Sequence, residues 1–181
     1  MAKSYSDEVN VRIFESIKQR IPWLLIGLLG GILAFKIVSV FESTLSNNLI
    51  LVAFIPLIVY MSDAVGTQME AFVIRDFALH SKIRFTKYFI KHLITTTFIA
   101  LILSLLLFII ILVFQVDFWV GVVLAISLFF STLSSVITGL ILPRFFEKIK
   151  LDPADASGPV GTIIQDILSV TIYFFIASAL L

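Results

Sequence analysis

Asp166 is a carboxylate in an otherwise apolar segment, and it is the only charged side chain from Gly158 to Leu181. A stretch of this length and composition predicts a helix that crosses a bilayer. A carboxylate near the centre of such a helix costs roughly 2.5–3.5 kcal/mol on insertion scales when it faces lipid. We therefore expect Asp166 to face protein or water. An acid in this position is typical of an ion pathway.

A second group of polar residues lies in the apolar stretch that starts near Leu49. Its members are spaced at i, i+3, i+4 and i+7 and so share one helical face; they are Asp63, Gly66, Thr67 and Glu70. Small and acidic residues on one stripe are typical of a helix that lines a narrow, watery path, where Gly66 can offer its backbone carbonyl. The helix of Asp166 has a similar face, made of Thr162, Asp166, Ser169 and Tyr173.

The depths of these acids in the membrane follow from the rise of a helix, about 1.5 Å per residue. Asp63 then lies about 21 Å below the outer end of its helix, and Asp166 lies about 18 Å below the outer surface of a core roughly 30 Å thick. The two acids come from helices of opposite direction and reach nearly the same level. Glu70 lies about 10 Å further inward, so the sequence predicts two acidic tiers.

The candidate ligands in these helices are all oxygen donors, which hard cations prefer. We predict a cation site built from Asp166, Asp63, Thr162, Glu70, Thr67 and Gly66. Mg²⁺ is the ion that this chemistry suggests, because it keeps several of its waters and binds to one or two carboxylates. Since one chain supplies a single Asp166, a twofold homodimer that brings two of them together is attractive.

The composition of the 181-residue chain predicts an integral membrane protein, with 60% hydrophobic and 14% charged residues. A soluble domain of this size could not bury so much apolar surface. Cysteine is absent and both histidines lie between apolar stretches, so a soft-metal site in the membrane is not expected. An intramembrane aspartyl protease could use Asp63 and Asp166 as a dyad, but neither acid lies in the expected Gly-x-Gly-Asp element. We therefore expect no enzyme.

The fold class that we expect is all-α, with five transmembrane helices. Their predicted ranges are 22–41, 49–75, 93–114, 118–142 and 158–181. Pro22 is expected to open the first helix, Pro143 to stop the fourth, and Pro159 to lie in the first turn of the fifth.

Lys and Arg gather in alternate connections, which fixes the orientation. The basic connections are the N-terminal segment, the second connection and the fourth connection, whereas the first and third contain neither Lys nor Arg. This bias predicts a cytoplasmic N-terminus and a C-terminus outside the cell membrane. We divide the chain into a cytoplasmic lead-in helix (1–20) and an ion-conducting transmembrane domain (21–181). The segment His80–His92 fits either an amphipathic helix at the inner leaflet or a basic loop, and neither implies nucleic acid.

A structural interpretation of the buried charges is also open. The acids could lock helices together, with basic residues as counter-charges. Arg75 could neutralise Asp76 or Glu70 near the inner surface, and Lys36 in the first span could extend its ammonium group outward to water. Asp166 has no basic residue in its own span to pair with.

Several segments together resemble the membrane domain of the MgtE family of magnesium channels and its solute-carrier relatives. The segments are RIPWLLIGLLGGILA (20–34), AFIPLI (53–58), VGTQ (65–68) followed by VIR (73–75), LPRFFEK (142–148), and LDPADASGP (151–159) followed by Gln165 and Asp166. The resemblance implies a homodimer whose pore is lined by the second and fifth helices. It also implies that Asp166 is the pore aspartate and that Mg²⁺ is conducted, with Mn²⁺ or Co²⁺ passing in some members.

The chain departs from the family pattern in two places. Ser62-Asp63-Ala64 stands where Gly-Gly-Asn is usual, so an extra acid enters the site. Bacterial members also carry a cytosolic domain and a paired CBS-type sensory domain, which the 20 residues before the first span cannot supply. Three alternatives to a simple channel stay open: an exchanger coupled to Na⁺ or H⁺, a membrane subunit regulated by a separate partner chain, and a non-conducting scaffold.

Overall fold

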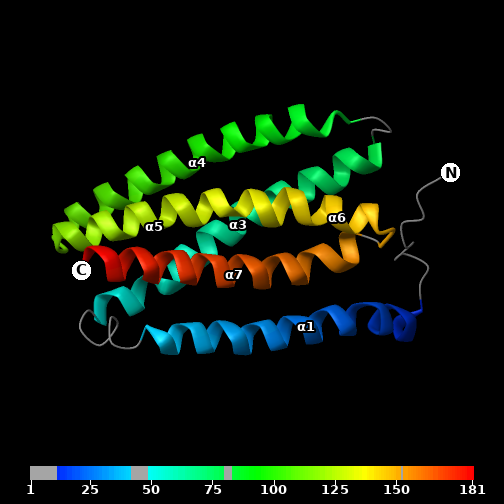
Figure 1. The fold of residues 1–181 in the computed structure, drawn as a ribbon, viewed down its shortest axis with the longest axis horizontal. Helices are drawn as coiled ribbons and strands as arrows, with labels where there is room; N and C mark the ends of the chain where they lie inside the picture. The colour runs from blue at the N-terminus through cyan, green and yellow to red at the C-terminus, as the bar shows by residue number, and fades with distance from the viewer. Residues whose placement is uncertain (1–11, 42–48, 80–82, 152) are drawn as a thin grey trace.

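The computed structural model describes residues 12–41, 49–79, 83–151 and 153–181, and all of its elements in these ranges are helices (Figure 1). They are α1 (Ile13–Val40), α3 (Leu49–Leu79), α4 (Phe85–Val113), α5 (Phe118–Val136), the π-helical turn η1 (Ile137–Ile141), α6 (Leu142–Lys148) and α7 (Pro153–Leu180). The helices α5, η1 and α6 follow one another without a gap and form one crossing. Five crossings are long and apolar enough to span a membrane within the described ranges, which confirms the predicted number.

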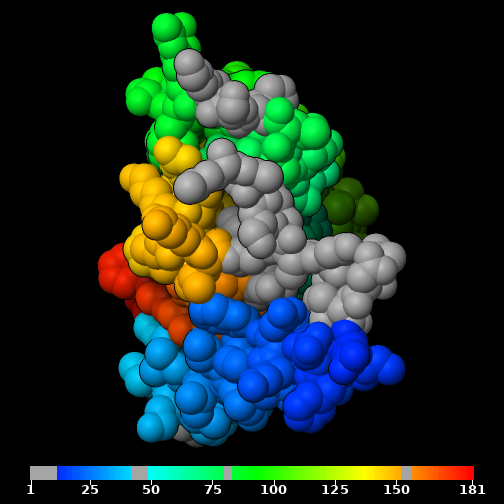
Figure 2. All heavy atoms as spheres, turned by 90° about the vertical axis from the view of Figure 1, so that its right-hand side faces the viewer, coloured from blue at the N-terminus to red at the C-terminus, as the bar shows by residue number. Residues whose placement is uncertain are grey.

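The helices α1, α5 and α7 run nearly along the long axis of the molecule, with α5 and α7 at the centre, α4 beside α5 and α1 beside α7 (Figure 1). The helix α3 crosses obliquely behind α5 and α7 (Figure 1). The helix α1 begins at one end of the bundle and α7 ends at the other (Figure 1). Figure 2 looks at the end where α1 begins and shows α1 as a separate layer at one edge of the molecule. Which end of the bundle is cytoplasmic remains the prediction from the charge bias.

Two apolar clusters hold the central helices together. The first lies where α3, α4, α5 and α7 meet, and its fully buried members include Leu51, Leu124 and Phe174. The second lies towards the other end of α3 and contains Met69, Val73 and Leu140. The most apolar window of α5–α6 is 56% buried, whereas that of α1 is 0% buried. The helix α5 is therefore the centre of the bundle, and α1 presents most of its surface to the surroundings.

The three prolines that were predicted to lie at helix ends, Pro22, Pro143 and Pro159, do not mark the ends in the way that the sequence predicted. Pro22 lies inside α1, which already starts at Ile13, and Pro159 lies inside α7, which starts at Pro153. Proline costs a helix one backbone hydrogen bond, which neighbouring helices in a membrane bundle can compensate. Pro143 does not end the fourth crossing, because the π-helical turn before it shifts the hydrogen-bond register and α6 starts afresh with Pro143 in its first turn.

All five crossings extend beyond the predicted membrane spans, and the extensions of α1 and α4 cover segments discussed from the sequence. α1 contains Ile13–Arg20 and runs without a break into the first span, so the described part of the lead-in is helical; residues 1–11 lie outside the described ranges. α4 contains Phe85–His92, which favours the helix over the loop for most of His80–His92; residues 80–82 are also outside the described ranges. Tyr88 and Phe89 pack against the second apolar cluster, which anchors this end of α4.

The start of α5 has a local cause in the sequence. The carboxylate of Asp117 accepts hydrogen bonds from the backbone N–H groups of Trp119 (2.8 Å) and Val120 (3.2 Å). A capping carboxylate satisfies N–H groups that a helix leaves free in its first turn. This cap fixes where the central helix begins.

Candidate functional site

The acids meet where α3 and α7 run antiparallel to each other. Polar contacts join the two helices at successive levels, beginning with the Tyr173 hydroxyl, which donates to the Leu51 carbonyl (2.9 Å). One level further, the hydroxyls of Ser62 and Ser169 are 2.7 Å apart. The two helices run in opposite directions, so residues after Ser62 on α3 lie against residues before Ser169 on α7. This pairing brings Asp63 and Glu70 of α3 against the first half of α7.

The upper tier of the site contains Asp63, Thr162 and Asp166. The side chain of Thr162 is hydrogen-bonded to Asp63, and Asp63 is close enough to Asp166 for the two carboxylates to interact electrostatically. Both carboxylates are half-buried, and Thr162 is exposed. The antiparallel register, with Ser62 against Ser169 and Glu70 against Ser157, agrees with the prediction that Asp63 and Asp166 reach similar levels from opposite directions.

The lower tier is centred on Glu70. Its carboxylate accepts a hydrogen bond from the Ser157 hydroxyl near the start of α7. Its two oxygen atoms lie 4.0 and 3.9 Å from the positions that Cβ atoms would take at Gly158 and Gly161, so glycines at these places leave room for the acid. Glu70 also interacts electrostatically with Asp63, one tier away.

Arg75 is the counter-charge of Asp76. The Arg75 Nε lies 3.5 Å from Asp76 Oδ1, and the Tyr88 hydroxyl donates to Asp76 Oδ2 at 2.8 Å. Of the two pairings considered from the sequence, the structure therefore shows the one with Asp76. Lys36 is exposed on α1, as expected for a side chain that reaches out to water.

A cavity of about 420 Å³ opens between α1 and α7 in front of the upper tier. Thr162 and Asp166 line it from α7, and small residues of α1 line the opposite side, among them Gly27, Gly30 and Gly31. Asp166 thus faces an open space, and Asp63, which does not line the cavity, is close enough to interact with it electrostatically. Thr162 and Asp166 are the side chains with oxygen acceptors that line the cavity, and the waters of a hydrated cation need both room and such acceptors.

The remaining predicted ligands on α3 have different surroundings. Thr67 is exposed on α3. Gly66 is buried, and a Cβ there would lie 3.3 Å from both Ser135 and Thr138. Its carbonyl oxygen lies 2.5 Å from the position of a Cβ at Gly139. Gly66 is therefore placed in a close contact between α3 and η1, and its carbonyl is directed at that helix.

A buried polar network lies behind the upper tier and was missed by the sequence reasoning. Gln165 is fully buried, and its Oε1 accepts a hydrogen bond from Thr138 (2.8 Å). Its Nε2 has two hydrogens and three acceptors within reach: the Ser131 carbonyl (3.1 Å) and the hydroxyls of Ser134 (3.1 Å) and Ser169 (3.0 Å). The network ties α7 to α5 and η1. A signal was present in the fourth span, where Ser127, Ser131, Ser134 and Thr138 recur at i, i+4, i+7 and i+11.

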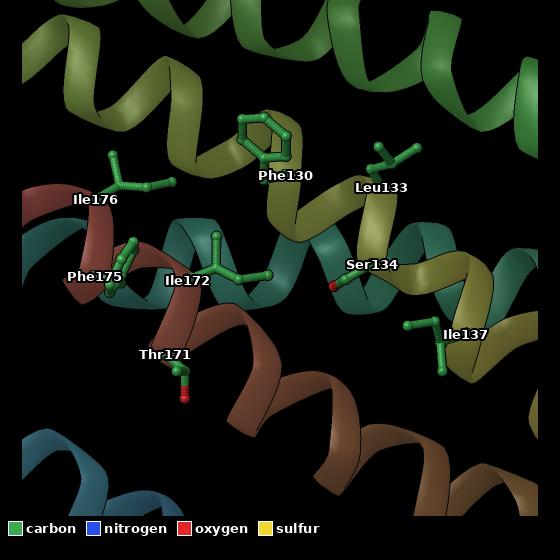
Figure 3. A pocket seen from close by; sticks show the side chains of 8 residues that line it. All are labelled: Phe130, Leu133, Ser134, Ile137, Thr171, Ile172, Phe175 and Ile176. Atoms are coloured by element: carbon green, nitrogen blue, oxygen red, sulfur yellow. The ribbon is translucent and has the colours of Figure 1, made fainter.

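The network reaches the outer surface of the bundle at Ser134. This residue lines a groove of about 640 Å³ between α5 and α7, whose other walls are mainly phenylalanine and isoleucine side chains (Figure 3). The groove is apolar and holds neither Asp63, Glu70 nor Asp166. The candidate cation site is therefore on the α1 side of α7.

Within the described residues, no group of three or more His, Asp or Glu side chains is close enough to hold a bare metal ion. What one chain presents is a carboxylate pair with a hydroxyl and an open cavity beside it. Such a set can accept hydrogen bonds from the waters of a hydrated Mg²⁺.

Comparisons with known proteins agree with this picture. A family model described as "MgtE: Divalent cation transporter" matches residues 55–176. The chain is 34% identical over 172 residues to the magnesium transporter MgtE of Bacillus subtilis, 29% over 174 residues to that of Enterococcus faecalis and 29% over 164 residues to that of Thermus thermophilus. These matches cover 94%, 95% and 90% of the chain but 38%, 38% and 36% of the relatives.

The family match covers α7 with Asp166 and most of α3 with Asp63 and Glu70. The relatives are transporters and not enzymes, in agreement with the expectation from the sequence. Five membrane-spanning helices make the protein a multi-pass membrane protein. The chain belongs to the MgtE family of divalent cation transporters.

Proposed function

We propose that the chain conducts hydrated Mg²⁺ across the cell membrane through a pathway lined by α3 and α7. The observation that carries the proposal is the meeting of Asp63, Thr162 and Asp166 beside an open cavity. Two carboxylates and a hydroxyl at one level give an entering cation negative charge and oxygen acceptors. Glu70, which lies on α3 one tier away from Asp63, gives the ion a second binding position.

The working unit in this proposal is a homodimer, with the N-terminus in the cytoplasm and the C-terminus outside. One protomer offers a half-buried Asp166 at the mouth of an open cavity, and a twofold axis there would place a second Asp166 opposite. Asp166 would then bind Mg²⁺ through its waters, with Asp63 adding to the charge around the ion. The proposed set is Asp166, Asp63, Thr162 and Glu70, with Thr67 exposed on the same helix; Gly66 packs against η1 and serves helix contact instead of ion binding.

The membrane potential is a sufficient driving force for this transport. Moving one charge through 100 mV yields about 2.3 kcal/mol, so a divalent cation that moves inward gains roughly 4.6 kcal/mol. The wide, open cavity agrees with an ion that keeps its waters, and other divalent cations such as Mn²⁺ or Co²⁺ are expected to pass as well.

The test is flux of Mg²⁺ into proteoliposomes that contain the purified protein, measured with a fluorescent indicator at a set membrane potential. We expect Asp166→Asn to abolish most of the flux and Lys36→Gln, on the exposed face of α1, to leave it unchanged. Flux that is the same in wild type and Asp166→Asn contradicts the proposal.

A coupled exchanger is the second candidate, and Asp63 is the observation that favours it. A carboxylate in the membrane can carry a proton, and Asp63 lies directly beside the proposed ion site. The same proteoliposomes separate the two functions. Flux that requires an opposing Na⁺ or proton gradient identifies an exchanger, and flux driven by potential alone identifies a channel. If flux appears only after a second protein is added, a separate regulatory subunit is required.

A further inference from the structure

The wall of the cavity that faces Asp166 belongs to α1 and consists of residues with little or no side chain. Gly27, Gly30 and Gly31 line the cavity from α1, while Thr162 and Asp166 line it from α7. In the predicted pathway only the second and fifth spans, α3 and α7, supply ligands. The glycines of α1 thus line the cavity in front of Asp166, although α1 supplies none of the predicted ligands.

The three glycines have different surroundings. A Cβ at Gly30 would lie 2.0 Å from Ile163 Cγ2, and a Cβ at Gly27 would lie 3.6 Å from Ile163 Cδ1. Gly30 therefore lets α1 approach α7 closely, which is the common role of glycine in membrane helices, whereas a Cβ at Gly27 would make an ordinary contact. A Cβ at Gly31 would meet nothing within 4 Å. Helix packing therefore accounts for Gly30 but not for Gly31, which borders open space.

We propose that α1 forms a third wall of the cation pathway and that Gly31 sets the clearance in front of Asp166. This inference rests on the proposed function and adds a specificity-determining residue to it. The ligand is a divalent cation with its shell of water. The carboxylates on α7 and α3 balance the charge of the cation. The space left at Gly31, which has no side chain, accommodates the outer waters.

The size of the cavity agrees with this ligand. Six waters occupy roughly 180 Å³ at about 30 Å³ each, which is less than the cavity volume of about 420 Å³. Mg²⁺ gives up its waters reluctantly, so a passage that is too narrow for them raises the barrier to permeation. A side chain at position 31 would take up part of this space without touching the helix contact at Gly30.

The first experiment measures whether position 31 is in the water-filled pathway. The chain contains no cysteine, so Gly31→Cys introduces a single thiol. A charged, water-soluble methanethiosulfonate reagent modifies the thiolate, which forms only where water has access. We expect Gly31→Cys in proteoliposomes to react and Mg²⁺ to slow the reaction. Leu29→Cys, at an exposed apolar position of α1 that does not line the cavity, is the matched control and should react slowly.

The second experiment measures clearance with Gly31→Ala, Gly31→Val and Gly31→Leu. We expect Mg²⁺ flux to fall in this order, by about tenfold for leucine if the added side chain raises the barrier by about 1.4 kcal/mol. The elution profile and melting temperature in detergent should stay near those of wild type, because no atom lies near the new Cβ. Gly30→Ala should instead lower the melting temperature, since its Cβ would overlap Ile163.

The outcomes separate this inference from the proposed function. If Asp166→Asn abolishes flux but Gly31→Cys is unreactive, or if Gly31→Leu conducts like wild type, α1 is not a wall of the pathway and the inference is wrong. If Gly31→Cys reacts with protection by Mg²⁺ and the size series lowers flux, the inference stands. If Asp166→Asn leaves flux unchanged, the proposed function itself is wrong.

Discussion

Replacing Gln165 by leucine tests whether the buried network behind the acids holds α7 in place. The side chain of Gln165 is within hydrogen-bond distance of Thr138, Ser131 and Ser134 on the neighbouring crossing, and of Ser169 on its own helix. Interhelical hydrogen bonds in a membrane protein average about 0.6 kcal/mol each, so the loss of three removes about 1.8 kcal/mol. For a protein of this size, that corresponds to a decrease in melting temperature of roughly 4–7 °C.

The assay is thermal unfolding of the purified protein in detergent, followed by the amount that stays monodisperse after heating. Ser127→Ala is the matched control, because the Ser127 hydroxyl is also fully buried on α5 but has no hydrogen-bond partner among the described residues. We expect Gln165→Leu to melt well below wild type and Ser127→Ala to melt close to it. Equal melting temperatures for the two variants would refute the reasoning, since the hydrogen bonds would then contribute nothing measurable.

Gln165→Glu sharpens the test because it keeps the size of the side chain. A glutamate can still accept from Thr138, but when ionised it cannot donate to the Ser131 carbonyl. We expect it to be destabilised as well, although its volume is unchanged. A loss with leucine but not with glutamate would assign the effect to shape and not to hydrogen bonding.

Two further predictions concern the other contacts of α3. Gly139→Ala should destabilise the protein by about 1–3 kcal/mol, because its Cβ would lie 2.5 Å from the Gly66 carbonyl oxygen; Gly27→Ala, whose Cβ would make an ordinary contact, should melt near wild type in the same assay. Asp63→Asn should raise the Mg²⁺ concentration for half-maximal flux about tenfold while flux persists, as expected for a loss of about 1.4 kcal/mol of binding energy. An unchanged half-maximal concentration in a titration of flux would show that Asp63 does not help to bind the ion.

The sequence predicted the elements of this fold well because each depends on a single stretch of chain. Five apolar stretches gave five crossings, and the predicted levels of Asp63 and Asp166 agree with the antiparallel register of α3 and α7. The predicted helix starts at Pro22 and near Pro159 were wrong, because both prolines lie inside helices. A proline within a helix is tolerated when neighbouring helices satisfy the backbone, and the sequence of one helix does not reveal its neighbours.

The surroundings of the site depend on contacts between helices and were harder to predict. That Gly31 faces Asp166 follows from how α1 lies on α7, and that Gly66 contacts Gly139 follows from the π-helical turn. Gln165 was noticed beside Asp166 in the sequence, but three of its four partners, Ser131, Ser134 and Thr138, lie on another crossing. Periodicity shows which residues share a face, whereas the neighbour that this face meets is set by packing of the whole bundle.

The contact between the backbones of Gly66 and Gly139 lies between the two acidic tiers on α3. Because no side chain separates the two backbones there, α3 and η1 approach each other more closely than a Cβ at position 139 would allow. Asp63 and Glu70 lie on either side of this contact, about 10 Å apart along α3. A bulkier residue at either glycine would push α3 away from η1 and change the distance of both acids from the central crossing.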